Sequence, residues 1–237
     1  MLYVGVSPPG PVSMKSIQLR PVSKLSAEQQ ATESLRESIL SGHLKPGERI
    51  TETALADQLG IARGTLRTGL NRLATEGIVV QTPYVGWQVA ELTADDIWEI
   101  WTLRGSLERL AATLVAKQGD AQVLQAIEAA FLALQKACAK GTRKAINQCD
   151  FTLHQAIIEG TGHQRLIRQY ALVQQQVRWV INTTNLLMHT SPETILEQHQ
   201  AFVQAILKGE SETAGELAWQ HNAYDGERLV QWVQGNA

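Results

Sequence analysis

The spacing of hydrophobic and polar positions divides the chain into a mixed first part and a helical second part. From residue 25 to residue 41 the hydrophobic side chains recur every three or four positions, which is typical of one face of a helix. Two more helices are predicted over residues 51–60 and 65–77, joined by a tight turn. Hydrophobic residues then alternate in steps of two over residues 78–81 and 87–89, as in a hairpin. This order predicts a winged helix-turn-helix.

From Thr93, a suitable N-cap, to the end of the chain we find only helical periodicity. Breaks in the pattern fall at Gly119, Gly141, residues 160–162, residues 191–192 and Gly209. They predict about six helices. We therefore expect a mainly α protein, with an N-terminal winged helix-turn-helix and a C-terminal all-helical bundle.

The limits of the domains follow from the same pattern. Residues 1–24 contain four of the seven prolines and no sustained periodicity, so we expect a flexible N-terminal arm. Residues 25–91 form the expected winged-helix domain, and residues 92–237 form the helical domain.

Composition restricts the class of protein. Hydrophobic residues make up 44% and charged residues 19%, which is ordinary for a globular protein, and no hydrophobic run approaches the roughly 20 residues of a membrane span. Cys138 and Cys149 are the only cysteines and lack CxxC spacing, so we expect no disulfide and a reducing, cytoplasmic setting. Lys and Arg outnumber Asp and Glu by nine to seven over residues 15–90, but are outnumbered by twelve to sixteen over residues 91–237. The first part therefore suits a polyanion, and the second suits a cation.

The start of the third predicted helix carries residue types that read DNA. Arg63 and Arg67 are four residues apart and share a face, and the N-terminal end of this helix enters the major groove in a helix-turn-helix. An arginine there can contact guanine or a phosphate, and Thr65 can add a hydroxyl contact. Arg36 on the first helix is placed for the DNA backbone. A surface charge is the usual role of a lone arginine, but the pair at this position favours DNA.

Four residues of the second part have the chemistry of metal ligands. Asp150 and His154 lie four residues apart on one predicted helix, so both side chains project from the same face. His199 and His221 lie on two later helices that could each direct one imidazole to the same point. Imidazoles with one carboxylate suit a borderline divalent ion, zinc or nickel above all. A lone helical histidine is more often a surface or hydrogen-bonded residue, and His43, His163 and His189 are given that interpretation.

The first part resembles the GntR family of bacterial regulators. The resemblance runs through residues 35–48, Glu52, Leu55–Ala56, Leu59–Gly60, residues 62–67, Leu70, Leu73 and Glu76–Gly77. It implies that Arg36, Arg63, Arg67 and the wing residue Gly86 contact DNA. The chain departs from the family pattern at Ala62, where the family usually has serine, and at Tyr84–Val85, where it often has a glycine and a basic residue.

The second part resembles the FCD domain, the helical effector module of the FadR branch of that family. The resemblance rests on Leu103–Arg104, Leu107–Glu108 and Ala111–Ala112, on residues 150–154, on residues 197–199 and on His221. It implies that Asp150, His154, His199 and His221 bind a metal and that the effector is a small organic acid.

Two further residues are expected to reach that acid. Arg104 would pair with the carboxylate, because a guanidinium matches it in a bidentate way. Asn147, three residues before Asp150 on the same face, would reach the ligand or orient the metal shell.

These features favour a homodimeric transcription regulator, a repressor by family analogy, whose operator affinity a carboxylate controls at a divalent-metal site. Two other hypotheses stay open. A metalloenzyme with a DNA-binding head would use a metal-bound water, although no HExxH motif supplies a general base. Alternatively, the metal is purely structural and holds three helices together.

Overall fold

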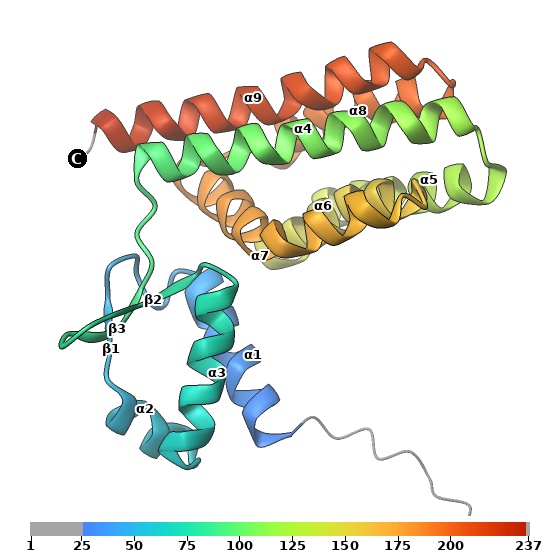
Figure 1. The fold of residues 1–237 in the computed structure, drawn as a ribbon. Helices are drawn as coiled ribbons and strands as arrows, with labels where there is room; N and C mark the ends of the chain where they lie inside the picture. The colour runs from blue at the N-terminus through green and yellow to red at the C-terminus, as the bar shows by residue number, and fades with distance from the viewer. Residues whose placement is uncertain (1–25, 236–237) are drawn as a thin grey trace, which may run out of the picture.

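The computed structural model describes residues 26–235, apart from the side chain of Leu186, and shows a small unit and a helical bundle (Figure 1). The small unit consists of α1 (Ala27–Leu40), β1 (Arg49–Ile50), α2 (Glu52–Leu59), α3 (Arg63–Thr75), β2 (Val79–Thr82) and β3 (Gly86–Val89). The bundle consists of α4 (Ala94–Gln118), α5 (Ala121–Lys140), α6 (Arg143–Gly160), α7 (Gln164–Leu187), α8 (Pro192–Leu207) and α9 (Ser211–Gly235). The predicted fold class is confirmed. The expected arm at residues 1–24 lies outside the described residues.

The helices of the small unit begin and end where the sequence places caps. The Ser26 hydroxyl accepts the Gln29 backbone N–H at 3.1 Å, and the Gln29 side chain accepts the Ser26 N–H in return. Gly60 ends α2 with φ 65°, a left-handed conformation that glycine adopts without Cβ strain. The two helices α2 and α3 therefore meet at a short, sharp turn.

Strand β3 lies between β1 and β2 in a three-stranded antiparallel sheet. Val80 is opposite Gln88 in the hairpin, and Ile50 is opposite Trp87 on the other side of β3. The hairpin agrees with the sequence pattern. The sequence analysis missed β1, because two residues are too few to show an alternation.

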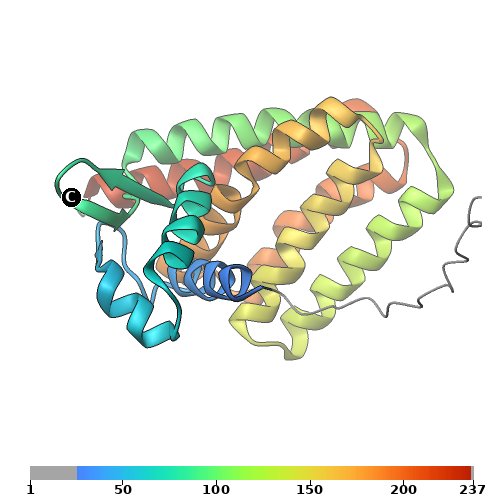
Figure 2. The ribbon, with the colours of Figure 1, turned by 60° about the horizontal axis from the view of Figure 1, so that its bottom comes forward.

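The core of the small unit is closed by a side chain from the bundle. Its fully buried members include Leu35, Ile39, Leu66, Leu70, Leu73 and Trp87. Trp179 of α7 belongs to the same cluster and is only 3% exposed. Nearby, the Asn182 side-chain amide donates to the backbone oxygen of Leu40, the last residue of α1, at 3.0 Å. The small unit thus packs against one end of the bundle, as Figure 2 also shows.

Helices α4 and α9 run antiparallel and close together along the bundle (Figure 1). Glycines permit this approach: a Cβ built on Gly226 would lie 2.2 Å from the Trp101 ring, and one on Gly105 would lie 3.0 Å from the Trp219 ring. The two tryptophan rings contact each other, with centroids 5.5 Å apart. Any larger residue at these glycines would force the facing tryptophan, or the helix that carries it, to move.

The bundle has its own hydrophobic core. Its most deeply buried members include Ile127, Leu134, Leu153, Val177, Phe202, Val203 and Ile206. Burial of each such side chain contributes about 1.5–3 kcal/mol. None of the helices in residues 26–235 has the length and hydropathy that crossing a membrane requires.

We expect Gly226→Ala to destabilise the bundle by at least about 1 kcal/mol, because the new methyl group must displace Trp101. Thermal unfolding followed by circular dichroism should show a melting temperature lower by a few degrees. Gly235→Ala is the matched control, because a Cβ there meets nothing within 4 Å. Equal stability of Gly226→Ala and the wild type would contradict the close packing of α4 and α9.

Candidate functional site

Three histidines from three helices meet inside the bundle. His154 lies on α6, His199 on α8 and His221 on α9, and each occupies the inward face of its helix. Their exposed fractions are 2%, 1% and 8%, and one nitrogen from each lies within 4.8 Å of the others. The structure therefore brings together the three histidines that the sequence singled out.

The distances among these side chains fit a metal ion. The Nε2 atoms of His154 and His199 are 3.1 Å apart, and Asp150 Oδ1 lies 3.4 Å from each of them. An ion about 2.1 Å from each of two ligands, at tetrahedral or octahedral angles, separates them by about 3.0–3.4 Å. The spacing of these three atoms matches that requirement.

The other ring nitrogens are held so that Nε2 is left for an ion. His154 Nδ1 lies 3.0 Å from Glu108 Oε2, and His199 Nδ1 donates to the backbone oxygen of Ile195 at 2.7 Å. When both rings are neutral and Nδ1 carries the proton, as in the metal-binding form, the two Nε2 lone pairs face each other at 3.1 Å. A cation between them would relieve this repulsion, and such Nδ1 partners are typical of metal-bound histidines.

The electrostatics of Asp150 and His221 give them the charge states of ligands. Burial opposes ionisation of Asp150, but the His199 and His154 rings outweigh it and hold its pKa well below the usual range. Burial, together with His199 and His154, holds the pKa of His221 well below its usual value. An ionised carboxylate and a neutral imidazole are the forms that bind a metal. Asp150 Oδ1 and His221 Nδ1 also have no hydrogen-bond partner.

Glu108 on α4 anchors this arrangement, and the sequence analysis assigned it no role in the site. Its carboxylate accepts from Arg104 Nε at 2.9 Å, from the Tyr170 hydroxyl at 2.8 Å and from Asn222 Nδ2 at 2.8 Å, besides facing His154. Burial raises its pKa, but Arg104 and His154 outweigh this and hold the pKa well below normal. The same carboxylate outweighs the effect of burial on His154 and raises the pKa of that imidazole. The only sequence signal was a glutamate four residues after Arg104.

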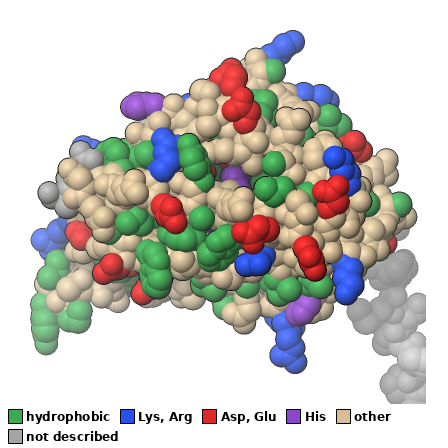
Figure 3. Space-filling model, turned by 90° about the horizontal axis from the view of Figure 1, so that it is seen from above, with side chains coloured by type: hydrophobic (Ala, Val, Ile, Leu, Met, Phe, Trp, Pro, Cys, Tyr) green, Lys and Arg blue, Asp and Glu red, His purple; other side chains and the backbone are tan. Residues whose placement is uncertain are grey.

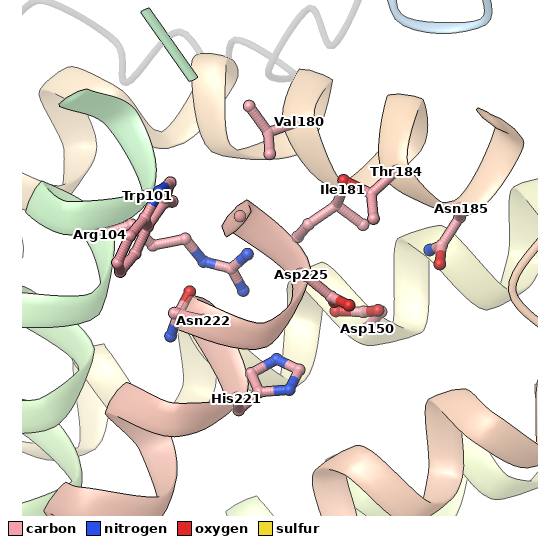
Figure 4. A pocket seen from close by; sticks show the side chains of 11 residues that line it. Trp101, Arg104, Asp150, Val180, Ile181, Thr184, Asn185, His221, Asn222 and Asp225 are labelled. Atoms are coloured by element: carbon pink, nitrogen blue, oxygen red, sulfur yellow. The ribbon is translucent and has the colours of Figure 1, made fainter. Parts of the chain in front are cut away.

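A small cavity of about 10 Å³, roughly the space of one water, adjoins the histidine cluster at His221 and Asp150 (Figure 4). It is lined by Trp101, Arg104, Asp150, Val180, Ile181, Thr184, Asn185, His221, Asn222, Asp225 and Gly226. In the described part of the chain, eight buried side-chain polar atoms lack a hydrogen-bond partner, and six belong to these residues. Those six are Trp101 Nε1, Arg104 Nη2, Asp150 Oδ1, Thr184 Oγ1, His221 Nδ1 and Asn222 Oδ1. Because buried polar groups are normally paired, this cavity has the character of a polar binding site.

The two residues expected at the effector differ in position. Arg104 is 5% exposed and lines the cavity, and its Nη2 has no hydrogen-bond partner; its contact with an effector stays a prediction. Asn147 is not among the lining residues. Its amide donates to Asn182 Oδ1 at 2.7 Å and accepts from Asn185 Nδ2 at 2.9 Å. Asn147 reaches the cavity only through Asn185.

The residues expected at DNA lie on the small unit. Arg63 is exposed and Thr65 half-buried at the start of α3. Arg67 is also exposed, but its Nε is 3.1 Å from both carboxylate oxygens of Glu52, which also accepts the Trp87 indole N–H at 2.9 Å. This pair orients Arg67 on the outer face of α3.

Arg36 and Gly86 complete that set. Arg36 is 6% exposed, and its guanidinium pairs with Glu76 at 2.7 Å and with Glu33. A contact between Arg36 and DNA stays a prediction and would require this pair to open. Gly86 begins β3 with φ 99°, next to the fully exposed Tyr84 at the tip of the hairpin. The sequence analysis treated Tyr84 only as a departure from the family pattern.

Family profiles match both parts of the chain. The profile described as "Bacterial regulatory proteins, gntR family" matches residues 27–89, and that of the FCD domain matches residues 99–224.

Among curated proteins, the chain is 30% identical over 199 residues to the "Uncharacterized HTH-type transcriptional regulator YdhC" of Bacillus subtilis (strain 168), covering 82% of this chain and 87% of that protein. It is 24% identical over 210 residues to the "HTH-type transcriptional repressor GlaR" of Escherichia coli (strain K12), covering 85% and 95%.

Solved structures show the same fold. The structure of E. coli McbR/YncC superposes with a TM-score of 0.71 at 21% identity, covering 88% of this chain and 99% of that one. A GntR-type protein from Rhodococcus sp. RHA1 superposes with a TM-score of 0.72 at 21% identity, covering 90% and 100%.

We expect His199→Ala to lose a divalent ion that the wild-type protein retains after reconstitution, because Nε2 of His199 lies among the proposed ligand atoms. Native mass spectrometry with elemental analysis measures this directly. His189→Asn is the control: it removes an exposed imidazole and keeps a residue type that tolerates the positive φ at this position. Equal metal content in His199→Ala and the wild type would contradict the site.

Proposed function

This chain belongs to the GntR family of bacterial regulators and carries an FCD domain, and on that premise we propose that a small carboxylate, bound at a divalent metal ion in the bundle, controls its affinity for an operator. The observation that carries the proposal is the buried cavity in which Arg104 Nη2, Asp150 Oδ1 and His221 Nδ1 lack partners. We further propose that the protein is a repressor, as the name of the related GlaR states for that protein.

The DNA contacts of the proposal lie on α3 and the hairpin. Arg63, Thr65 and Arg67 would enter the major groove at the N-terminal end of α3, where side chains reach base edges. Gly86 lets the hairpin turn sharply, so that the exposed wing can follow the DNA backbone.

Asp150, His154, His199 and His221 would hold the metal, and zinc or nickel fits their donor set best. When bound, such an ion supplies positive charge and open coordination positions for a carboxylate. Arg104 would hold the same carboxylate through its free Nη2, since Nε is already occupied by Glu108.

A homodimer would present two winged helix-turn-helix units to an inverted-repeat operator. The outer face of α4 supports this, because Ile100, Leu103, Leu107, Leu110 and Leu114 recur at alternating steps of three and four, the spacing of helices that pack on each other. Leu103 is 47% and Leu110 is 44% exposed. Hydrophobic side chains gather on the face that α4 and α9 share (Figure 3). We propose that a second copy of this chain covers the stripe.

Residues of helix α7 connect the cavity to the small unit, which contains the proposed DNA-binding surface. Asn185 lines the cavity and donates to Asn147, which donates to Asn182, which donates to the Leu40 backbone at the end of α1. One turn earlier, Trp179 packs in the core of the small unit. A ligand that shifts α7 would therefore shift α1 as well, and coupling of this kind is typically worth about 1–3 kcal/mol.

The relatives and folds that match are transcription regulators, which favours a regulator over an enzyme. A purely structural metal is the second candidate, because the ligands come from three helices. Chelation would then unfold the bundle, and no acid would change operator affinity.

We expect Arg63→Ala to weaken binding to a duplex selected by the wild-type protein by about 1–3 kcal/mol, because it removes a groove contact. Fluorescence anisotropy over a series of salt concentrations measures the affinity and the salt slope. Arg72→Ala on the same helix serves as the control, since Arg72 is exposed and faces Glu76 at 3.7 Å. The DNA proposal fails if both variants bind as the wild type does.

We expect Arg104→Lys to reduce acid affinity about ten- to a hundred-fold with metal content unchanged, because lysine keeps the charge beside Glu108 but lacks a second nitrogen to place in the cavity. Calorimetry with the metal-loaded protein and a panel of small acids tests this, with operator release as a second measurement. Loss of metal in Arg104→Lys would contradict the assignment of Arg104 to the acid and not to the metal. If no acid releases DNA and removal of the metal by a chelator unfolds the bundle, the results favour a purely structural metal.

A further inference from the structure

The cavity contains a carboxylate that has no cation beside it. Asp225 lies on α9, four residues after His221, and lines the cavity together with Asp150 (Figure 4). Gln198 Nε2 donates to Asp225 Oδ1 at 3.2 Å. Within residues 26–235, no Lys, Arg or His nitrogen lies within 4.0 Å of this carboxylate. No spacing or motif in the sequence had marked Asp225 as part of the site.

The charges in and around the cavity disfavour the binding of a ligand with a net negative charge. Glu108, Asp150 and Asp225 are carboxylates, whereas Arg104 is the guanidinium among them. With all three carboxylates ionised and the histidines neutral, a divalent ion together with Arg104 would offset these three negative charges. A plain carboxylate ligand would then leave one uncompensated negative charge in a buried place, which is costly. A carboxylate ligand that also carries a positive charge would leave no uncompensated charge.

We infer that Asp225 makes this pocket selective for a small amino acid, whose ammonium group it binds while Arg104 and the metal hold the carboxylate. This inference rests on the proposed function, and it narrows the acid to a zwitterion.

The unpartnered atoms of the cavity, together with the carboxylate of Asp225, match both ends of such a ligand. Arg104 Nη2 and Trp101 Nε1 are donors, which a carboxylate needs. Asn222 Oδ1 and the carboxylate of Asp225 are acceptors, which an ammonium group needs. A hydroxy acid supplies a donor for Asp225 but no positive charge, and an unsubstituted acid supplies neither. The cavity of about 10 Å³ holds one water, so an amino acid would enter only as the lining side chains move apart.

The test compares acids with the same carbon skeleton. Metal-loaded protein is titrated by calorimetry with alanine, lactate and propionate, then with glycine, glycolate and acetate, and with the larger amino acids each beside its hydroxy and unsubstituted counterpart. We expect at least one amino acid to bind at least tenfold more tightly than both of its counterparts and to release the operator.

The variant Asp225→Asn decides whether Asp225 causes the preference. It keeps the shape and the acceptor for Gln198 but removes the charge, so the amino acid should lose at least tenfold in affinity while its counterparts bind as before or better. Glu227→Gln, an exposed acid on the same helix, should change nothing. An amino group could also bind the metal directly, but that preference would survive Asp225→Asn, and its survival would overturn the inference.

The inference and the proposed function can fail separately. If hydroxy or unsubstituted acids bind as well as amino acids and release DNA, the ammonium assignment to Asp225 is wrong and the acid-controlled regulator stands. If no compound of any class binds or changes operator affinity, both are wrong.

Discussion

The buried carboxylate of Glu108 connects four helices of the bundle, and the proposed site depends on it. From α4 it receives hydrogen bonds from Arg104 on its own helix, Tyr170 on α7 and Asn222 on α9, and it faces His154 on α6. Removing one member of such a buried charged network typically costs about 3–5 kcal/mol, because a charge is left without a partner. The network fixes the rotamer of Arg104 and the ring orientation of His154 together. The cavity and the histidine cluster are therefore parts of one polar core.

That polar core is incomplete on one side. An unpaired buried donor or acceptor costs about 1–3 kcal/mol, and six such atoms surround the cavity. The hydrophobic packing of the bundle offsets this cost. A metal and a polar ligand that satisfied these atoms would gain the same free energy on binding. These unpaired groups would favour an occupied state of the pocket, in agreement with the proposed sensing role.

The contact between the bundle and the small unit connects this site to the winged helix-turn-helix. Trp179 is anchored in the hydrophobic core of the small unit, whereas Val180, the next residue of α7, lines the cavity. Because packed cores resist small continuous deformation, a shift of α7 at the cavity has to move Trp179 or rearrange its packing. The amide contacts from Asn185 through Asn147 and Asn182 to Leu40 follow the same direction. Asn147, first considered as a ligand contact, fits this connection better.

Local signals in the sequence determined the helices, the hairpin, the cap at Thr93 and the inward faces that carry Asp150, His154, His199 and His221. These features depend on the period of the backbone and on nearest neighbours, so they can be read along the chain. Only the tertiary structure decided that Glu108 faces His154, that Asp225 shares a cavity with Arg104, that Arg36 is buried against Glu76 and that Trp179 crosses into the other domain. Periodicity tells which side of a helix faces inward, but not which residue of another helix it meets. That depends on how the helices pack, through contacts between residues far apart in the chain.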